Sequence, residues 1–394
     1  MENDILKKSI KVKIIRIILI SEILLTLVFI ALYLYSFQGN LRLHSLRTIS
    51  NINGMYTTIL KNDVKMLSAA LDTFSNNEDY KLLFQKRDRI KLYEAGKNLF
   101  IHNRDSYGIT NFLFITEEGR CFLRMHQPQL ADDLLKRSTV EQARATGKTA
   151  SGLALGKMGF ALRVAAPYTY KGSLIGYLEF GEEINHLDRI VKEEIGSDVM
   201  VLVNKGLFNE QDYRTARKNL SQSDNWDDLN KHVLVSDTLG DRQFFISKIY
   251  NEHDVSAVGA GEGGHSYLGM VTRGGRIFIR GAFPISNTGG NTIGVVMVLN
   301  DVTALIKQAS VTVLSLILAA VALFAVSLWA TYGFLNREII QPLVDLSQQA
   351  VKVSMGKVDS KLESARGDEI GLLIQSFDRI RVSLKMALSM VEKK

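Results

Sequence analysis

The sequence contains a single cysteine, Cys121, in 394 residues. One thiol excludes an intramolecular disulfide framework, a cysteine-rich metal knuckle and a c-type haem attachment site. Histidine is absent from the C-terminal part of the chain, since the last one is His265. That part therefore holds no phospho-accepting histidine, and no glycine-rich nucleotide loop or cyclase signature fits into it. We expect a protein that is not an enzyme and that needs no cofactor.

The overall charge is +7, with 48 Lys and Arg against 41 Asp and Glu. A positive balance can indicate a nucleic-acid partner. The basic residues, however, are spread along the chain and are densest beside two long apolar runs. Flanking positive charge is typical of membrane spans. We therefore expect the lipid bilayer as a partner and no nucleic acid.

The first apolar run covers residues 14–37 and is broken only by Arg16 and Glu22. Its length is sufficient to cross about 30 Å of hydrocarbon. No small-residue cleavage site follows it, so a secretory signal peptide is the weaker interpretation. Because a carboxylate is costly in lipid, we expect Glu22 at a helix–helix interface or near the headgroups, with a functional role as the alternative.

The second run covers residues 309–336, carries no charge, and is followed at once by Arg337. Basic residues also crowd the N-terminal side of the first run: Lys7, Lys8, Lys11, Lys13 and Arg16. Positive residues mark the cytoplasmic side of membrane spans. The two runs are therefore predicted to be transmembrane helices with both termini in the cytoplasm. Residues 1–13 would then be cytoplasmic and residues 38–306 would lie outside a bacterial inner membrane.

Two helices with heptad spacing follow the second run. The first has apolar residues at steps of four and three: Ile339, Leu343, Leu346, Ala350 and Val353. The second continues the same steps: Ile370, Leu373, Phe377, Ile380, Leu384, Ala387 and Val391. A polar connector between them holds Gly356 and two apolar residues that can fold back onto a bundle, Val358 and Leu362. Two helices cannot close a core, whereas a parallel homodimer supplies four, so the pattern predicts a homodimer.

At this point the sequence resembles the HAMP domain of bacterial receptors and sensor kinases, over about residues 334–387. The likeness rests on Pro342 in the first helix, Gly356 in the connector and the run Asp368-Glu369-Ile370-Gly371 that opens the second helix. Acidic residues at that position also favour the helix dipole. The resemblance implies a signal-relaying bundle within residues 337–390, with signalling roles for Pro342, Gly356, Asp368, Glu369 and Gly371. An ordinary juxtamembrane coiled coil is the alternative.

Between the two runs, heptad-like positions predict a long helix: Ile49, Ile52, Tyr56 and Ile59, then Leu60, Val64, Leu67 and Leu71. A second helical region is expected at residues 78–102. Strand patterns follow at residues 112–116, 121–125, 151–155, 160–168 and 174–181, with an amphipathic segment at 131–146 and a hairpin turn at 117–120. We expect a five-stranded antiparallel sheet backed by the long helix.

A helix at residues 183–195 leads to a second set of strand patterns: 199–204, 233–236, 244–250, 267–272, 276–283 and 292–300. This order, with stretches such as Phe122-Leu-Arg-Met-His-Gln-Pro128 and Gly172-Ser-Leu-Ile-Gly-Tyr-Leu-Glu179, resembles a double Cache sensor over residues 40–306. The resemblance implies a distal PAS-like module near residues 75–195 and a proximal one near 196–306. The predicted fold is an α+β membrane protein with two transmembrane helices, this double Cache-like sensor on a long stalk helix and a C-terminal HAMP bundle.

Alternation along the distal strands places five polar side chains at one parity: Arg124, His126, Arg163, Tyr177 and Glu179. The other parity is apolar: Leu162, Val164, Leu174 and Leu178. Guanidinium groups pair bidentately with anions, so this set could clamp a small carboxylate or zwitterion. A solvated outer sheet face with cross-strand ion pairs is the alternative. The amino-acid-binding motif of well-known double Cache sensors is not traceable, which leaves the ligand class open.

Two further patterns carry little weight. The run from Gly259 to Gly264 has dinucleotide-type spacing, but it lies between strand patterns and does not open a helix, so a flexible hairpin loop is expected. His253 stands between Glu252 and Asp254, where a solvated loop is a better interpretation than a metal site. We therefore expect no metal.

Together these observations predict a signal-transduction receptor that binds a small extracytoplasmic ligand and relays a conformational signal through HAMP to a cytoplasmic partner. HAMP proteins usually continue into a kinase, a chemotaxis hairpin or a cyclase, and none fits before Lys394. The chain either passes its signal to another protein or is the truncated or split input half of a sensor kinase or diguanylate cyclase. A membrane-anchored solute-binding accessory of a transporter is a second alternative, which would not need the paired heptads.

Overall fold

The computed structural model describes residues 10–156, 159–207, 209–261, 264–287, 289–359 and 365–391. The chain divides into two compact units. One unit is formed by residues 38–307, and the other combines residues 1–37 with residues 308–394. The two are called here the sensor unit and the helical unit.

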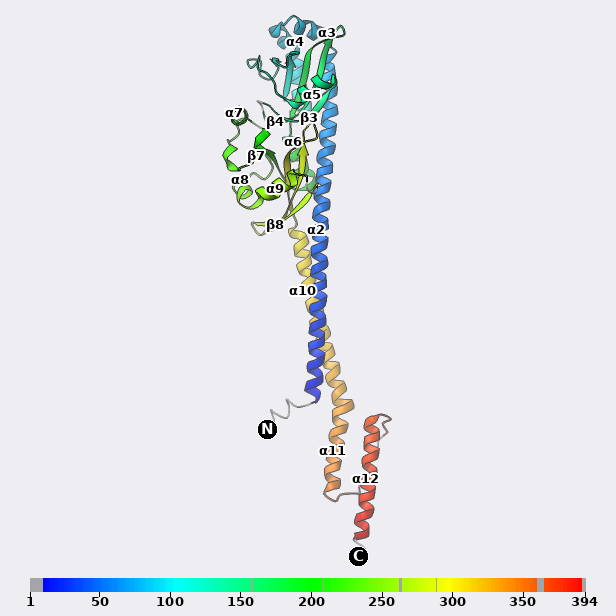
Figure 1. The fold of residues 1–394 in the computed structure, drawn as a ribbon. Coiled ribbons are helices and arrows are strands. Elements are labelled where there is room, and N and C mark those ends of the chain that lie inside the picture. The colour runs from blue at the N-terminus through cyan, green and yellow to red at the C-terminus, as the bar shows by residue number, and fades with distance from the viewer. Residues whose placement is uncertain are drawn as a thin grey trace. The chain divides into compact units, whose positions relative to one another are not determined.

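The sensor unit alternates helices with two sets of strands (Figure 1). Its first half contains the C-terminal part of α2 (Ile10–Ser75), α3 (Glu78–Gln85), α4 (Arg89–Tyr107), β1 (Asn111–Ile115), β2 (Cys121–Arg124), α5 (Ser138–Thr146), β3 (Ala150–Gly156), β4 (Gly159–Tyr170), β5 (Ser173–Glu183) and α6 (Asn185–Ile195). Its second half contains β6 (Asp198–Asn204), α7 (Glu210–Asn219), β7 (His232–Asp237), α8 (Arg242–Phe244), α9 (Glu252–Gly259), β8 (Ser266–Arg273), β9 (Arg276–Ser286) and β10 (Thr292–Asp301).

The two sheets have the same topology. The distal sheet has the strand order β2-β1-β5-β4-β3 and the proximal sheet the order β7-β6-β10-β9-β8, with antiparallel pairing throughout. Adding five to each strand number of the distal sheet gives the strand order of the proximal sheet. This repetition confirms the predicted pair of PAS-like antiparallel modules and the α+β fold class.

Both sheets pack on helix α2 (Figure 1). Ile49 and Tyr56 are buried where the helix meets the proximal sheet, and the ring of Tyr56 lies 5.9 Å from that of Phe283. Further along, Phe74 is buried in an aromatic cluster on the distal sheet and lies 4.5 Å, centroid to centroid, from Phe112. The heptad-like positions of the sequence are therefore the buried face of one helix.

The opposite face of each sheet has a cover of its own. On the proximal sheet a π-helical turn (Phe245–Ile249) and α9 bury Phe245 and Val255 against strands β6 and β10. On the distal sheet α5 and the loop before it bury a smaller apolar group that includes Val140 and Tyr177. The amphipathic prediction for residues 131–146 was too long, because the helix begins only at Ser138.

The predicted strand at residues 244–250 was wrong. Asp241 caps a short helix there through a 3.0 Å hydrogen bond from the Phe244 N–H, and a π-helical turn follows over Phe245–Ile249. Phe245 and Ile249 are buried, whereas Ser247 between them is exposed. A strand would place all three residues on the same face, so this burial pattern fits a helical turn. The sequence analysis also did not predict helix α7.

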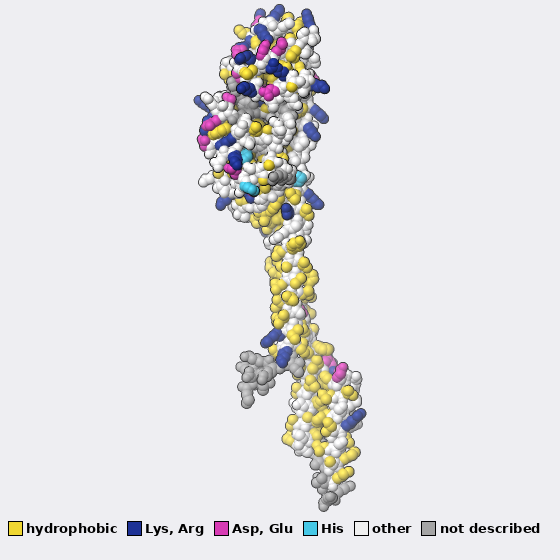
Figure 2. Space-filling model, in the orientation of Figure 1, with side chains coloured by type: hydrophobic (Ala, Val, Ile, Leu, Met, Phe, Trp, Pro, Cys, Tyr) yellow, Lys and Arg dark blue, Asp and Glu magenta, His cyan; other side chains and the backbone are white. Residues whose placement is uncertain are grey.

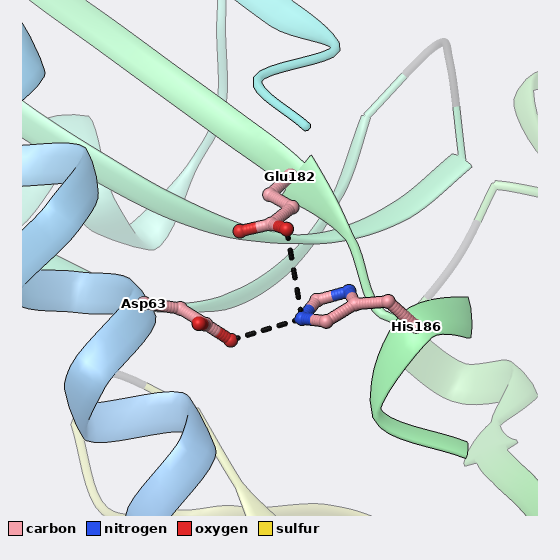
Figure 3. A group of neighbouring side chains, drawn as sticks. All are labelled: Asp63, Glu182 and His186. Carbon is pink, nitrogen blue, oxygen red and sulfur yellow. Dashed lines mark hydrogen bonds and ion pairs between the residues drawn. The ribbon is translucent and has the colours of Figure 1, made fainter. Parts of the chain in front are cut away.

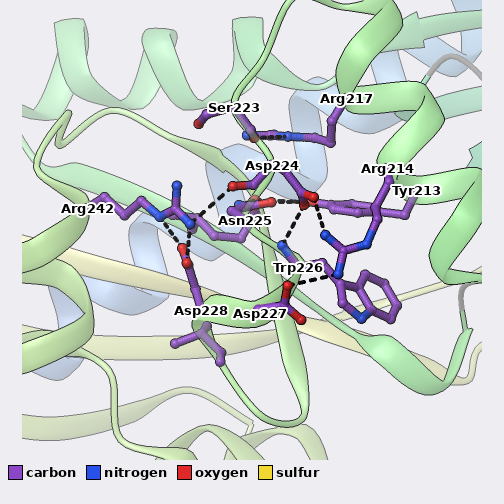
Figure 4. A network of polar contacts seen from close by, with 12 residues as sticks. Tyr213, Arg214, Arg217, Ser223, Asp224, Asn225, Trp226, Asp227, Asp228 and Arg242 are labelled. Atoms are coloured by element: carbon purple, nitrogen blue, oxygen red, sulfur yellow. Dashed lines mark hydrogen bonds and ion pairs between the residues drawn. The ribbon is translucent and has the colours of Figure 1, made fainter.

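Ion pairs fasten α7 and the loop after it (Figure 4). Arg214 on α7 contacts Asp224 and reaches Asp227 at 2.8 Å, and Arg242 pairs with Asp228. Beneath them the Tyr213 hydroxyl donates to Asn225 Oδ1 at 2.8 Å. The exposed pairs add little stability individually, so the buried Tyr213 bond is the firmer anchor.

The His253 cluster and the glycine-rich run from Gly259 to Gly264 are both associated with helix α9. His253 is exposed in the first turn of α9, where Asn251 caps the helix by accepting from the Asp254 N–H at 3.1 Å. The loop predicted for Gly259–Gly264 follows α9, which ends at Gly259, but residues 262–263 lie outside the described part of the chain.

The helical unit contains the N-terminal part of α2 together with α10 (Thr303–Phe334), a π-helical segment (Leu335–Ile340), α11 (Gln341–Ser354) and α12 (Glu369–Val391). Two of its helices are long and apolar enough to cross a membrane. Figure 2 shows their hydrophobic side chains as an almost uncharged band. Glu22 lines a cleft of about 320 Å³ with residues of α10 such as Ile317 and Ala320, as expected for a carboxylate at a helix–helix interface.

The close approach of α2 to the proximal sheet predicts a specific coupling. A methyl group added at Gly281 on β9 would lie 2.1 Å from Ile49 Cδ1. We expect Gly281→Ala to destabilise the sensor by about 1–3 kcal/mol through overpacking, and Ile49→Ala by about 2–4 kcal/mol through its cavity. The double variant should be more stable than the sum of the two predicts, measured by urea unfolding. Simple additivity would contradict this packing.

Candidate functional site

The covered face of the distal sheet contains a buried ion pair. Arg163 on β4 and Glu179 on β5 lie near one another in register and are both fully buried. The Arg163 Nη1 group donates to Glu179 Oε1 at 3.2 Å, and Arg163 Nε donates to the Ala154 carbonyl at 3.4 Å. Burial excludes the solvated alternative for these two residues.

Two residues that the sequence analysis missed complete this pair. Arg137 precedes helix α5 and contacts Glu179 through Nη1, and Thr139 in its first turn donates to Glu179 Oε2 at 3.0 Å. Arg137 was not singled out because residues 131–146 were predicted only as an amphipathic segment with no part in the site. The available signal was that Arg137 directly precedes Ser138 and Thr139, residue types that commonly begin a helix.

The structure does not bring Arg124 into this pair. It is buried on β2 and forms a bidentate ion pair with Asp133, at 2.7 and 2.8 Å, while Nη1 also donates to the Leu130 carbonyl at 2.7 Å. These bonds fix the loop that leads into α5. Arg124 therefore holds the cover of the site in place, and Asp133 was not predicted from the sequence.

The remaining two predicted residues border the ion pair differently. His126 Nδ1 accepts a hydrogen bond from the Phe112 backbone N–H at 3.1 Å. Burial, and next the positive charges of Arg163 and Arg124, lower the pKa of His126 to about 3, so the ring is neutral at ordinary pH. Tyr177 is buried in the apolar group beneath α5 and has no contact with the ion pair among the interactions of the described residues.

A cleft opens beside the two arginines. It has a volume of about 370 Å³ and is lined by Asp133, Leu134, Leu135, Lys136, Arg137, Gly156, Leu207, Asn209 and Asp212. At Gly156 an added Cβ would lie 2.5 Å from Arg163 Nη2 and 2.8 Å from Arg137 Nη2. Both Nη2 groups therefore converge on the glycine that lines the cleft.

The buried charges do not balance. Arg124 pairs with Asp133, whereas the ion pairs that Arg137 and Arg163 form within the described residues both go to one carboxylate, Glu179. Burial, and after it the charge of Arg137, lowers the pKa of Arg163 to about 9. Within the described chain Arg163 Nη2 is buried without a hydrogen-bond partner, which is costly for a charged donor. One additional anion between the arginines would satisfy both the charge and the donor.

The predicted relay residues meet at a second place, where α11 begins. Pro342 has no N–H and so leaves the Glu338 carbonyl without its intrahelical donor. Arg366 supplies a donor in its place, with Nη2 3.0 Å from that oxygen, and also pairs with Asp368 at 2.7 Å. Asp368 in turn caps α12 by accepting from the Gly371 N–H at 2.9 Å.

The local backbone and charges also explain why the other residue types of the HAMP motif suit their positions. At Gly371 an added Cβ would lie 2.2 Å from the Arg366 carbonyl oxygen, so only glycine fits the cap. Arg366 and the Gly371 N–H lower the pKa of Asp368 to about 2, which keeps the cap charged. Gly356 has φ +85°, a left-handed conformation that favours glycine. Glu369 is exposed in the first turn of α12, where its charge favours the helix dipole.

The lowered pKa of His126 predicts a pH-dependent stability. Below pH 6.5 the unfolded chain binds a proton at this histidine that the folded chain does not bind, so folding loses stability as pH falls. Relative to His126→Gln, the wild-type sensor should lose about 2 kcal/mol between pH 7 and pH 5. Urea unfolding at the two pH values measures the difference, with His102→Gln on exposed α4 as the control. Parallel curves for wild type and His126→Gln would contradict the buried neutral ring.

Two family models match the chain. The first is described as a double sensory domain of two-component sensor kinase and covers residues 42–306, which is more than half of the chain. The second is the HAMP domain and covers residues 334–386. None of the curated proteins compared with the chain matches it.

Several solved structures resemble the chain. The sensor domain of the Vibrio cholerae histidine kinase DctB has 8% identity and a TM-score of 0.39, with 68% of this chain and 98% of that chain covered. The periplasmic domain of Vibrio cholerae LuxQ has 12% identity and a TM-score of 0.38, with coverage of 65% and 99%. The ligand-binding domain of the Campylobacter jejuni chemoreceptor Tlp3, in complex with L-norvaline, has 11% identity and a TM-score of 0.31, with coverage of 63% and 92%.

At this level of similarity neither ligand nor output can be transferred from these structures. The family models are different, because each spans a complete domain of the chain, and with the two apolar helices they give the architecture of a transmembrane sensory receptor. The chain belongs to the family of double sensory domains of two-component sensor kinases and carries a HAMP domain after its second apolar helix.

Proposed function

We propose that this receptor binds a small carboxylate or zwitterion in its distal module, outside the membrane, and relays binding through HAMP to a cytoplasmic signalling partner. The observation that carries the proposal is the buried Arg163 Nη2 group, which lacks an acceptor within the described chain and faces Gly156 beside Arg137. Guanidinium pairs of this kind bind carboxylates in a fixed geometry.

The ligand class follows from charge and size. The arginines and Glu179 leave one positive charge, which a single carboxylate neutralises. The adjoining cleft of about 370 Å³ is at the small end of the usual range for ligand pockets. Asp212 also lines it and offers a carboxylate to an ammonium group, which favours a zwitterion such as an amino acid.

A direct connection links the proximal sheet to the second span. β10 ends at Asp301 and α10 begins at Thr303. The Thr303 N–H donates to Asp301 Oδ1 at 2.8 Å, and the Ile277 N–H donates to Thr303 Oγ1 at 2.8 Å. Because β9 and β10 both hold the first residue of α10, a change in the sheet is transmitted to that helix. Close-packed bundles respond to small shifts in discrete steps.

The proposed orientation rests on charge. Lys13 and Arg16 flank the first span and Arg337 follows the second, which favours cytoplasmic termini and an extracytoplasmic sensor. Within HAMP, Ile380 is 61% exposed and Leu373 49% exposed in the single chain, although both occupy heptad positions. A second copy would cover them, so we propose that the receptor acts as a homodimer.

The second candidate function is the input half of a sensor kinase. The matching family is described by its occurrence in two-component sensor kinases, which favours a kinase over a cyclase as the output. Both candidates use the same ligand site and the same relay. They differ in whether the output is a separate protein, which the neighbouring coding sequence would decide.

Binding should depend on Arg163. Full-length receptor in nanodiscs would be screened by thermal shift against amino acids and small carboxylates, since a ligand at 100 times its Kd stabilises the folded state by about 2.7 kcal/mol. We expect Arg163→Glu to abolish the thermal shift given by the best compound, because the substitution replaces the guanidinium donor with a negative charge that repels the ligand carboxylate. Arg144→Gln, at an exposed position of α5, is the matched control and should keep the shift. A full shift in folded Arg163→Glu would contradict the site.

The homodimer predicts cross-links within the relay. Single cysteines at Ile339 and Ile370 should form intersubunit disulfides under mild oxidation, since both positions face the seam of a parallel bundle. Native Cys121 can remain, because it is buried and burial raises the pKa of its thiol to about 11. Gln348→Cys, at an exposed position outside the heptad seam, should react far more slowly. Equal rates at all three positions would contradict the bundle.

A further inference from the structure

Three potential metal ligands converge on the far side of the distal sheet from the arginine pair (Figure 3). They are Asp63 on α2, Glu182 at the end of β5 and His186 in the first turn of α6. His186 Nε2 lies 3.0 Å from Asp63 Oδ2 and 3.5 Å from Glu182 Oε1. All three ligand atoms lie within 4.8 Å of one another. The proposed ligand site uses none of these residues.

The second nitrogen of the histidine fixes its orientation. His186 Nδ1 lies 2.8 Å from the Glu183 carbonyl oxygen, which can only accept a hydrogen bond. Nδ1 therefore carries a proton, and a neutral ring presents the Nε2 lone pair to the two carboxylates. Metal-bound histidines are commonly held in this way, with the other ring N–H donated to a backbone carbonyl.

Glu182 supplies an independent indication of a missing ligand. It is only 7% exposed, and its Oε2 atom is buried without a hydrogen-bond partner in the described chain. A buried carboxylate with an unused oxygen is poorly compensated by one histidine.

We propose that Asp63, Glu182 and His186 bind a divalent transition-metal ion of the zinc type. One neutral imidazole and two carboxylates neutralise a doubly charged ion, and nitrogen–oxygen sets of this kind suit zinc and cobalt. With bonds near 2.1 Å, tetrahedral ligands lie about 3.4 Å apart. The observed 3.0 and 3.5 Å separations are close to that value, so Asp63 and Glu182 need only small rotations to enclose an ion. Water would complete the coordination.

A metal ion at this position would connect two parts of the sensor. Asp63 belongs to the stalk helix, whereas Glu182 and His186 lie where the distal sheet passes into the helix that leads to the proximal module. A bound ion would therefore join the stalk helix to the junction between the two modules. Without metal, a protonated His186 between the two carboxylates is the competing arrangement.

The probe is Co²⁺ alone, added to full-length receptor that carries no histidine tag and has been treated with EDTA. We expect one equivalent per chain, visible d–d absorption and displacement of Co²⁺ by Zn²⁺. His186→Gln and Asp63→Asn should each weaken Co²⁺ binding at least about a hundredfold, because loss of outer-shell partners alone costs 10–100-fold. His253→Gln, an exposed histidine between two acidic residues, is the matched control and should bind normally.

A measurement on the wild-type chain removes the dependence on variant folding. Diethyl pyrocarbonate should modify His186, whose side chain is 21% exposed, and bound Zn²⁺ should protect it at least about tenfold, as read by peptide mass spectrometry. Equal modification with and without Zn²⁺, or Co²⁺ binding that survives in folded His186→Gln, would overturn the site. No Co²⁺ binding by wild type would overturn it as well and would leave the protonated ion-pair arrangement.

Discussion

The sensor depends on burying one face of a single helix. Helix α2 supplies Ile49 and Tyr56 to the proximal sheet and Phe74 to the distal sheet, and these residues join the two modules in one apolar core. With only Cys121 available, no intramolecular disulfide can share this task. The hydrophobic contact between helix and sheets therefore sets the positions of both modules along α2, and every polar site of the sensor is built on that frame.

Buried charge is concentrated where function is proposed. Taking a guanidinium out of water is costly unless its partners are complete. Arg124 is paired with Asp133, whereas Arg163 shares Glu179 with Arg137 and has one Nη2 donor without a partner among the described residues. The relay solves a different problem, because Pro342 frees a carbonyl that Arg366 then binds. In the relay an arginine satisfies the free carbonyl, and in the sensor the ligand site that we propose would satisfy the remaining guanidinium donor.

Much of the fold follows from local patterns. Hydrophobic length predicted the two apolar helices, and alternation predicted eleven strands, of which ten correspond to β1 to β10 of the described chain. The strand prediction at 244–250 was wrong because a short apolar run does not contain enough periods to distinguish a strand from a buried helical turn. Helix α7 was missed because it is mostly polar and is held by contacts of Arg214 and Tyr213 with the loop that follows it, which no apolar period in the sequence indicates.

The sequence by itself determined the order of elements, the shared parity of Arg163 and Glu179 and the relay motif, because side-chain period and helix capping are properties of neighbouring residues. Only the tertiary structure decided which partners those residues meet. Arg137 reaches Glu179 across 42 positions, and His186 reaches Asp63 across 123. Such contacts arise when the packed core brings separate segments together, and no local pattern records them.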